Sequence, residues 1–486
     1  MERAGRMLSD TGIEENTLAI LDSTGIKDAK DEVDDRLSFL EAVRAASLAP
    51  DTGVAPTSKM CEAIFRILRE GKNLELCMGS YQLLMDINKR FPRLIAPSVE
   101  VSSSSTPVDS ELVVVREAWC PFVCGLDIPA STRGESSENC NKLIDSCGFR
   151  QLLENLVEEG NRSNKGIKSL GNMLLLDYLV NVLEGDFLPR RDSYKETTNW
   201  AIVRDSQLNL ILFNSTAMQS SRRINFKGLV KDCVTLLSTL QNQFTSYSHG
   251  ISDSEESKPI NDCDASVMIA LLEMKKRTCL AVRKLLLMIM ELDELKKSAD
   301  MHLQTTRGDS VRTPAFEIIL DELTYNTDAL FQFLQGSGKG IGLQAFDEPK
   351  WKLELAVQYL RKYIAKPSVR TRRSKDSTDD GTLVGLLNTL SSPATAKTVI
   401  RKIRSSEVLE FLLANAFQAY LSISIGMQLA DGTGNSSEIL QGNSKEEVCK
   451  GVISAFQSLK KADQHVGTLS IGKEALFAAA TILSLK

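Results

Sequence analysis

The stretch VRKLLLMIMEL, residues 282–292, decides the fold. It contains six consecutive apolar residues, Leu285 to Met290, and such a run surrounds a helix instead of lining one face. A helix that is apolar on all sides is covered by protein or by lipid. A membrane span needs about 20 apolar residues, and this run is far shorter. We therefore expect residues 282–292 to form the central helix of a folded core.

Amphipathic helices are predicted on either side of this segment, because apolar residues recur there at intervals of three and four. The clearest sets are Met60, Ala63, Ile64, Ile67 and Leu68; Val408, Phe411, Leu412, Ala416 and Ala419; and Leu353, Ala356, Val357, Leu360 and Ile364 within a helix over 351–364. Another helix is predicted to begin at Pro314, because Thr313 can cap it and proline suits the first helical position.

An acidic cluster precedes the predicted helix that holds Leu37, Leu40 and Val43. It consists of Asp28, Asp31, Glu32, Asp34 and Asp35. The unpaired N–H groups at a helix N-terminus favour nearby negative charge. We therefore interpret the acidic cluster as stabilising the start of this helix.

Strand signals are few and short. Leu112–Val115 is β-branched but brief, and Leu421–Ile425 alternates over only five residues, so neither predicts a sheet. Without a sheet, each helix can bury its apolar face only against other helices. The sequence thus predicts an all-α fold, an armadillo- or HEAT-like α-solenoid or helical array. Its repeats are degenerate, because no clean repeat period is evident.

Polar breaks divide the predicted helices. They fall at Pro97–Ser110, Asn161–Ser169, Thr245–Ser266, Lys366–Gly381 and Gly426–Lys445. The expected parts are an N-terminal helical part at 1–110, a middle helical part with Ser-rich linkers at 111–265, a central helical part at 266–365, a basic flexible linker at 366–382 and a C-terminal helical part at 383–486. One continuous solenoid fits the same pattern.

Charge and cysteine usage narrow the functional classes. Fifty-eight Lys and Arg against 63 Asp and Glu give a net charge of −5, so the overall balance attracts neither nucleic acid nor anionic lipid. Residues 1–16 contain no apolar stretch of the kind that a secretory signal needs. We therefore expect a protein without a membrane span, kept inside the cell, whose ten cysteines are reduced and in part buried.

Three partial chemical motifs lack the context that they require. Gly336–Gly342 resembles a phosphate loop, but Gly340 follows Lys339 where Ser or Thr is needed, and a helix precedes it. Cys120, Cys124, Cys140 and Cys147 lack the tight spacing of a zinc knuckle. Ser310 follows no strand, and Asp463 with His465 does not complete a triad. We expect no catalytic residue, cofactor, metal or small-molecule substrate.

A basic tract is the one polar feature that stands out. Lys366, Arg370, Arg372, Arg373 and Lys375 fall within ten residues that include no acid. Such a tract is typical of a nuclear import signal, of an arm that contacts phosphates, or of a solvated loop. The residues leave these three interpretations open. No aromatic residue lies within the tract, so stacking on bases is not indicated.

Six segments are distinctive as a set: Glu15–Asp28, Arg36–Leu48, Ile64–Gly71, Gly308–Tyr325, Pro349–Tyr359 and Pro367–Arg373. Together they resemble one family, the plant negative regulators of systemic acquired resistance, along nearly the whole chain. The chain departs from the family pattern at Gly336–Gln344, which is an added Gly-rich linker. The Ser-rich stretches at 101–110 and 251–262 are also enlarged.

The resemblance implies a nuclear protein with an armadillo-like fold that represses defence genes and homologous recombination in unstressed cells. It implies an Nse-six-type subunit of the chromosome-maintenance complex built on the Smc-five and Smc-six ATPases, beside an Nse-five-type partner. Loss of such a subunit would leave DNA damage signalling active and raise defence genes. Our leading interpretation is therefore a non-enzymatic nuclear scaffold. The alternative is a transcriptional corepressor that binds nucleic acid through the basic tract; in the leading interpretation any DNA contact is weak or indirect.

Overall fold

The chain is helical in nearly all of the part that the structure describes. This computed structural model describes residues 16–21, 29–50, 53–71, 73–95, 113–114, 119–122, 143–160, 167–213, 225–250, 262–305, 312–335, 348–364, 382–429, 444–463 and 468–485. Long helices follow one another through these ranges, so the predicted all-α fold is confirmed.

The molecule divides into two compact units, Met1–Ile319 and Leu320–Lys486. Unit 1 contains α2 (Ala29–Leu48), α3 (Ser58–Glu70), α4 (Leu74–Arg90), α5 (Ser146–Gly160), α6 (Ile167–Thr197), α7 (Trp200–Arg204), α8 (Gln207–Phe213), α9 (Phe226–Gly250) and α10 (Asp262–Met301). The boundary falls inside α11 (Ala315–Tyr325). Unit 2 continues with α12 (Thr327–Gln335), α13 (Pro349–Tyr363), α14 (Leu383–Leu390), α15 (Pro393–Ile403), α16 (Ser406–Leu429), α17 (Lys445–Ala462) and α18 (Ser470–Ser484).

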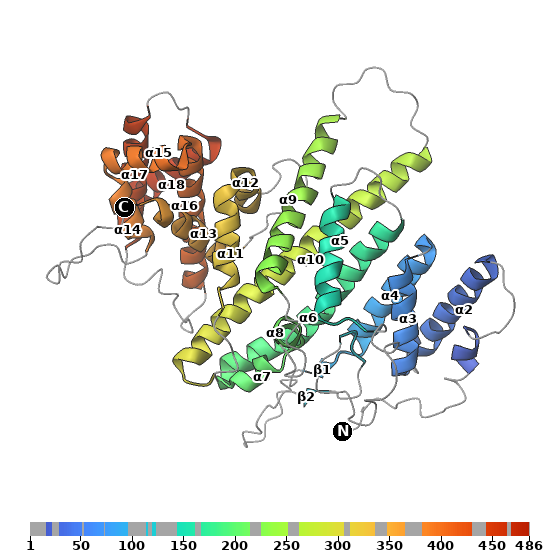
Figure 1. The fold of residues 1–486 in the computed structure, drawn as a ribbon. Helices are drawn as coiled ribbons and strands as arrows, with labels where there is room; N and C mark the ends of the chain where they lie inside the picture. Colours follow the sequence, from blue (N-terminus) through green and yellow to red (C-terminus); the bar gives the residue numbers. More distant parts are fainter. Residues whose placement is uncertain are drawn as a thin grey trace. The chain divides into compact units, whose positions relative to one another are not determined.

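Unit 1 is a row of neighbouring helices with α6 and α10 at its centre (Figure 1). Helix α2 packs on α4, α4 on α6, α6 on α10, α10 on α9, and α9 on α5. Every apolar residue of 282–292 except Leu287 is buried. The prediction that this segment forms the central core helix is therefore confirmed.

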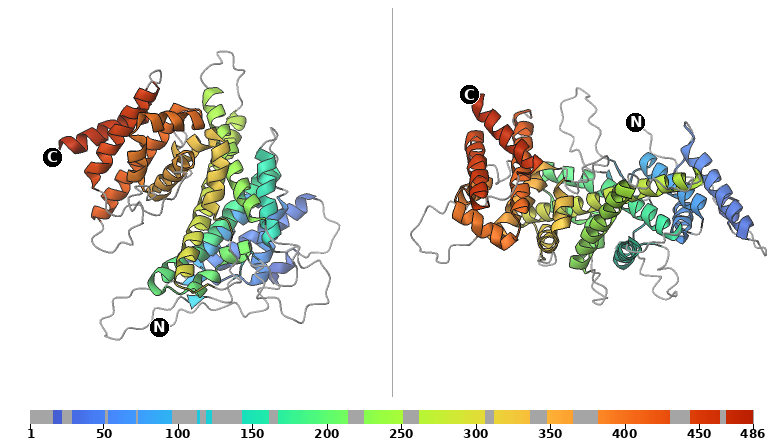
Figure 2. Two further views of the ribbon diagram at one scale, coloured as in Figure 1. Left: turned by 60° about the vertical axis from the view of Figure 1, so that its left-hand side comes forward. Right: turned by 90° about the horizontal axis from the view of Figure 1, so that it is seen from above.

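Unit 2 is built around α16, which packs against α13, α15, α17 and α18. Helix α17 in turn contacts α14 and α18 (Figure 2). The stretch Ser406–Ile425 of α16 has a length and composition that would suit a membrane span, but 67% of it is buried inside the protein. Burial of this kind is what the core helix of a bundle shows.

The helical periods read from the sequence mark the buried faces of these helices. All five apolar positions predicted in α3 and all five in α16 are buried. In α13, Leu353, Ala356, Val357 and Leu360 are buried, whereas Ile364, just after the helix, is half-buried. The start of α2 differs from the expectation, because the helix begins at Ala29 and contains four of the five acidic residues that were expected to precede it. Asp31 and Glu32 occupy its first turn, where negative charge is favourable.

Three further details differ from the sequence-based expectations. Val113–Val114 (β2) forms a two-residue antiparallel pair with Leu94–Ile95 (β1), so the prediction that 112–115 takes part in no sheet was wrong. Helices α9 and α10 also extend into the break predicted at Thr245–Ser266, to Gly250 and from Asp262. Propensity is a weak guide where a long helix is already packed along much of its length.

The third detail is the start of α11, which begins at Ala315, one residue after the predicted Pro314. The N–H of Ala315 donates to Oδ2 of Asp293 at 2.8 Å. Asp293 lies 22 positions earlier, in α10. The residue that caps this N–H therefore comes from another helix, whereas the sequence pattern pointed to the adjacent Thr313.

Candidate interaction surface

The basic tract predicted from the sequence, Lys366, Arg370, Arg372, Arg373 and Lys375, lies outside the described residues. It connects α13 to α14 in the chain. Nζ of Lys402 in α15 donates to the carbonyl oxygen of Tyr363, the last residue of α13, at 2.9 Å. Arg401 and Lys402 form the basic last turn of α15. Lys402 is thus attached close to the point where the tract begins in the chain.

The residues of the three partial chemical motifs are for the most part not described. Gly336–Gly342, Ser310, His465, Cys124 and Cys140 lie outside the described residues. Within the described ranges, no three His, Cys, Asp or Glu side chains gather as a metal site.

Buried cysteine thiols are unreactive in this fold. Burial raises the pKa of Cys61 and that of Cys279 to about 12 each. A thiol is nucleophilic as the thiolate, and at neutral pH these two stay protonated. They fill core positions, as the sequence pattern indicated for several of the cysteines.

Charged side chains link α6 to α10 at intervals of seven residues. Nζ of Lys284 donates to Oε2 of Glu184 at 2.7 Å. Nη1 of Arg191 donates to Oε2 of Glu291 at 3.0 Å. In both pairs the partners are 100 positions apart, so the two helices run in the same direction and keep one register over two turns.

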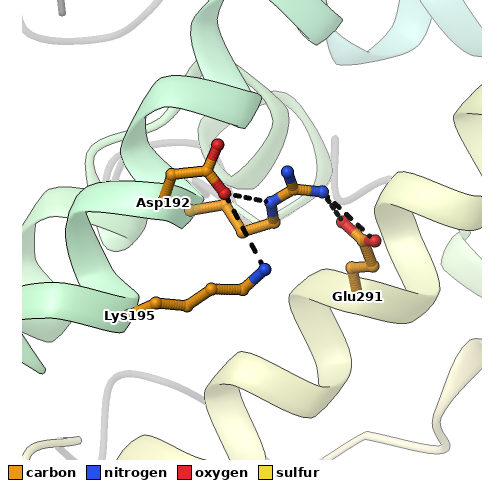
Figure 3. A network of polar contacts seen from close by, with 4 residues as sticks. Asp192, Lys195 and Glu291 are labelled. Carbon is orange, nitrogen blue, oxygen red and sulfur yellow. Dashed lines mark hydrogen bonds and ion pairs between the residues drawn. The ribbon is translucent and has the colours of Figure 1, made fainter. Parts of the chain in front are cut away.

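Near the end of α6, Asp192 and Lys195 extend the Arg191–Glu291 pair into a network of four charged residues (Figure 3). Nε of Arg191 donates to Oδ1 of Asp192 at 2.9 Å, and Nζ of Lys195 lies 3.8 Å from the same oxygen. Glu291 approaches from α10. In the first pair the base, Lys284, lies on α10, whereas in the second pair the base, Arg191, lies on α6. If one helix slid past the other by seven residues, a side chain of one pair would therefore face a like charge of the other pair. The pairs therefore favour the observed register of the two central helices over a shift of seven residues.

Two helical turns nearer the N-termini of α6 and α10, Tyr81 of α4 contacts a third pair of charged residues. The hydroxyl of Tyr81 donates to Oδ2 of Asp177 at 2.5 Å and accepts from Nη1 of Arg277 at 3.5 Å. Residues 177 and 277 precede 184 and 284 by seven positions. Burial raises the pKa of Asp177, although the Tyr81 hydrogen bond and the Arg277 charge act in the opposite direction. We use the name α6–α10 ladder for Asp177, Arg277, Glu184, Lys284, Arg191 and Glu291.

The family-like segment Gly308–Tyr325 contains a buried arginine that joins three helices. The guanidinium of Arg312 lies 3.7 Å from the ring centroids of both Phe213 and Phe226. Its Nη2 donates to Oδ1 of Asp293 at 2.5 Å. Burial lowers the pKa of Arg312 to about 10, against the opposing effect of Asp293. The segment therefore attaches the start of α11 to α8, α9 and α10 within unit 1.

Helix α18 differs from the other long helices because much of its apolar surface is uncovered. Its buried residues are the small Gly472, Ala475 and Ala479. Phe477 is 75% exposed and Leu485 is 81% exposed. Phe477 lies within α18 and Leu485 directly after it, and exposed apolar side chains mark an interaction site where they form a contiguous patch.

A cavity of about 230 Å³ opens beside α18 in unit 2. Ile453, Phe456 and Leu476 supply apolar walls, and Glu410 and Lys460 also line it. Oε1 of Glu410 accepts a hydrogen bond from the N–H of Leu469 at 2.8 Å and so caps α18. Burial raises the pKa of Glu410. We use the name α18 surface for Phe477, Ala480, Leu476 and this cavity.

The α18 surface was not predicted from the sequence. The sequence did mark this helix as unusually apolar. Residues 469–485 contain two charged residues, Lys473 and Glu474, and a few Ser and Thr, and the others are apolar or glycine. A pattern of this kind usually belongs to a helix that is covered on all sides. The structure instead buries its small residues and leaves Phe477 outside.

Comparison with known proteins gives matches along the whole chain. A family model described as the SNI1 middle domain matches residues 93–337, and one described as the SNI1 C-terminal domain matches residues 364–486. The chain is 43% identical to a protein of Arabidopsis thaliana named negative regulator of systemic acquired resistance SNI1. That similarity extends over 486 residues and covers 99% of this chain and 97% of the Arabidopsis protein.

Proposed function

This chain belongs to the SNI1 family, and from that membership we propose that it is a negative regulator of systemic acquired resistance that works by binding other proteins. The proposal rests on the 43% identity, over 99% of this chain, to the Arabidopsis protein named negative regulator of systemic acquired resistance SNI1. A similarity that spans both family domains favours a shared role for the whole molecule.

We propose further that the protein acts in the nucleus as an Nse-six-type subunit of the Smc-five/Smc-six complex. In this role it binds an Nse-five-type partner and contributes to the DNA damage response and to homologous recombination. Two features support a scaffold role. The described residues are helical in nearly all of their length, with the α6–α10 ladder linking the two central helices of unit 1, and α18 exposes the large apolar side chain of Phe477.

Two measurements on plants test this proposal. The first is complementation: the chain should restore low defence-gene expression in a plant that lacks its own family member. The second is affinity purification of the tagged chain from nuclei, in which the Smc-five and Smc-six subunits should be recovered in near-stoichiometric amounts. Rescue without those subunits would leave the regulatory role standing and exclude the role in chromosome maintenance.

A second candidate function is nucleic-acid binding through the basic tract. It is favoured by Lys402, which attaches the basic end of α15 to the last residue of α13, near the tract in the chain. Phosphate contacts make affinity depend on salt. Replacing Arg370, Arg372 and Arg373 with Ala should therefore weaken DNA binding and flatten its salt dependence. Unchanged DNA binding by this triple variant would exclude the tract as the contact.

A further inference from the structure

We infer that helix α15 of unit 2 binds the phosphate backbone of double-stranded DNA without reading its sequence. The contact consists of Lys397, Arg401 and Arg404, which we name the α15 basic face. The inference deepens the proposed binding of nucleic acid, on which it rests, because it adds a contact within the described residues to the basic tract. It is carried by the geometry of the face, by the backbone at Arg404 and by the balance of charge around α15.

The α15 basic face occupies one side of its helix. At 100° per residue, the Cα atoms of its three residues fall within about 60° around the helix axis. All three residues are exposed, whereas Ala396, Val399 and Ile403 are buried on the other side of the helix. Within the described part of the chain, none of the three cations has an ion pair or a side-chain hydrogen bond. The face is therefore available to a ligand outside the chain.

The backbone at Arg404 is unusual for an arginine. Arg404 is the C-cap of α15, and its φ of 63° and ψ of 17° lie in the left-handed region. Glycine is the usual residue there because it has no Cβ to be strained, and α3 indeed ends at Gly71 with a φ of 58°. Strained residues of other types cluster at functional sites. The helix dipole favours cations in the last turn, but it requires neither an arginine at this cap nor Lys397 farther back in the helix.

Cations outnumber acids in the helices around α15. Helix α15 packs against α13, α14, α16 and α17. From α13 to α17, caps included, the described residues contain twelve Lys and Arg and seven Asp and Glu, although the whole chain has a net charge of −5. No acid occurs between Gly381 and Ser406. The excess of positive charge is therefore a local property of this part of unit 2.

The acids nearest to the end of α15 do not cancel its charge. Glu410 is only 1% exposed and accepts the hydrogen bond from the N–H of Leu469. Asp463 lines the cavity together with Lys460. Glu407, in the first turn of α16, is exposed and is one acid against the three cations of the face. The positive charge of the α15 basic face thus remains after these acids are counted.

A row of cations without an apolar anchor suits a regular polyanion. Protein partners are held mainly by large buried anchors, and the other exposed residues beside the face, Ala394 and Thr398, are small. Single-stranded nucleic acid stacks on aromatic side chains, and α15 contains none. From Lys397 to Arg404 the helix rises about 10 Å, over which one strand of B-DNA presents about three phosphates. Both charge and spacing therefore favour a duplex backbone.

Packing connects both ends of α15 to other basic segments. At its C-terminal end, Nζ of Lys402 donates to the carbonyl oxygen of Tyr363 at 2.9 Å, and the basic tract follows Tyr363 in the chain. Just before its N-terminal end, the hydroxyl of Ser458 donates to the carbonyl oxygen of Ser391 at 2.5 Å. Ser458 belongs to α17, whose last turn contains Lys460 and Lys461. The α15 basic face is therefore not an isolated group of cations.

The deciding experiment titrates a fluorescently labelled DNA duplex of mixed sequence with the full chain and follows its anisotropy at several salt concentrations. The face variant combines Lys397→Ala, Arg401→Ala and Arg404→Gly. It should raise the dissociation constant about tenfold or more and should flatten the logarithmic salt slope by roughly 1 for each cation removed.

Two controls separate the α15 basic face from net charge and from folding. Combining Lys89→Ala, Lys168→Ala and Lys297→Ala removes the same charge from exposed positions of unit 1 and should leave DNA affinity unchanged. Arg404→Gly alone places glycine where the backbone is left-handed, so the melting temperature should not fall. The same single variant should still weaken DNA binding, which a purely structural role for Arg404 does not predict.

Each other outcome overturns the inference in a distinguishable way. If the face variant binds the duplex as the parent does, while replacing Arg370, Arg372 and Arg373 with Ala weakens binding, the basic tract is the contact and the second candidate function stands. A parent chain that does not bind the duplex would remove both. Equal losses in the face variant and the unit 1 control would assign binding to net charge. If the face variant keeps its DNA affinity but no longer binds vesicles of anionic lipid, the ligand is a membrane surface.

Discussion

Replacing Asp293 with Ala should destabilise unit 1 much more than the loss of a solvent-exposed ion pair of similar length would cost. Asp293 lies 2.5 Å from Arg312, and the two side chains are only 14% and 15% exposed. The substitution leaves the guanidinium buried without its counter-ion. Nε and Nη1 of Arg312 already lack hydrogen-bond partners in the described part of the chain, so the rings of Phe213 and Phe226 would be left as the contacts that offset the loss.

The expected cost is about 3 to 5 kcal/mol, which is typical when one partner of a buried pair is removed. It includes about 1 kcal/mol for the lost cap on the N–H of Ala315. The matched control is Lys362→Ala. Lys362 lies 2.6 Å from Asp321, but these side chains are 32% and 55% exposed. Exposed pairs contribute up to about 1 kcal/mol, and the control should therefore cost no more than that.

Urea denaturation followed by circular dichroism measures both costs, and hydrogen exchange at Ala315 reports the cap directly. The account requires Asp293→Ala to lower the free energy of unfolding well beyond Lys362→Ala and to expose the Ala315 amide to exchange. Equal costs for the two variants would refute this reasoning, because the burial of the Asp293 pair and its cap on Ala315 should both make Asp293→Ala the more costly change.

Three further predictions concern packing, register and pH. Gly472→Ala should lower the free energy of unfolding by about 1 to 3 kcal/mol, because the new methyl group collides with Glu410. Gly185→Ala, where the methyl group enters open space beside α6, should instead raise it by about 0.5 to 1 kcal/mol. A urea titration that ranks the two variants in the opposite order would contradict this prediction. A double-mutant cycle on Arg191 and Glu291 should give a coupling of about 0.5 to 1 kcal/mol, and zero coupling would remove the pair as a register device. Because burial raises the pKa of Glu410, protonation favours the folded state, and this contribution to stability is lost as the pH rises through the folded pKa. Glu410→Gln should therefore be at least as stable as the parent at pH 7, and its advantage should shrink on acidification; an advantage that grows towards low pH would reverse this assignment.

The sequence predicted what depends on local periodicity. The apolar run at 282–292 could be assigned to the core because no helix exposes such residues on all sides without a cover. The helix that holds Leu37, Leu40 and Val43 was also predicted, although α2 begins at Ala29, before most of the acidic cluster. The resemblance to the family of plant negative regulators of systemic acquired resistance, based on six segments, is confirmed by the family models and by the Arabidopsis relative.

The sequence did not predict contacts between residues that are distant in the chain. The cap that Asp293 provides for α11 spans 22 positions, and the rungs of the α6–α10 ladder span 100. Both depend on how the helices pack, which a helical period does not specify. The exposure of Phe477 has the same origin, because it follows from α16 and α17 contacting the small residues of α18.

Cross-linking mass spectrometry with a lysine-reactive reagent on the assembly purified from nuclei tests the central claim, that this helical array works by holding a protein partner. We predict cross-links from exposed lysines of this chain to a second protein of the assembly. A preparation in which the chain is monomeric and cross-links only to itself would contradict the claim.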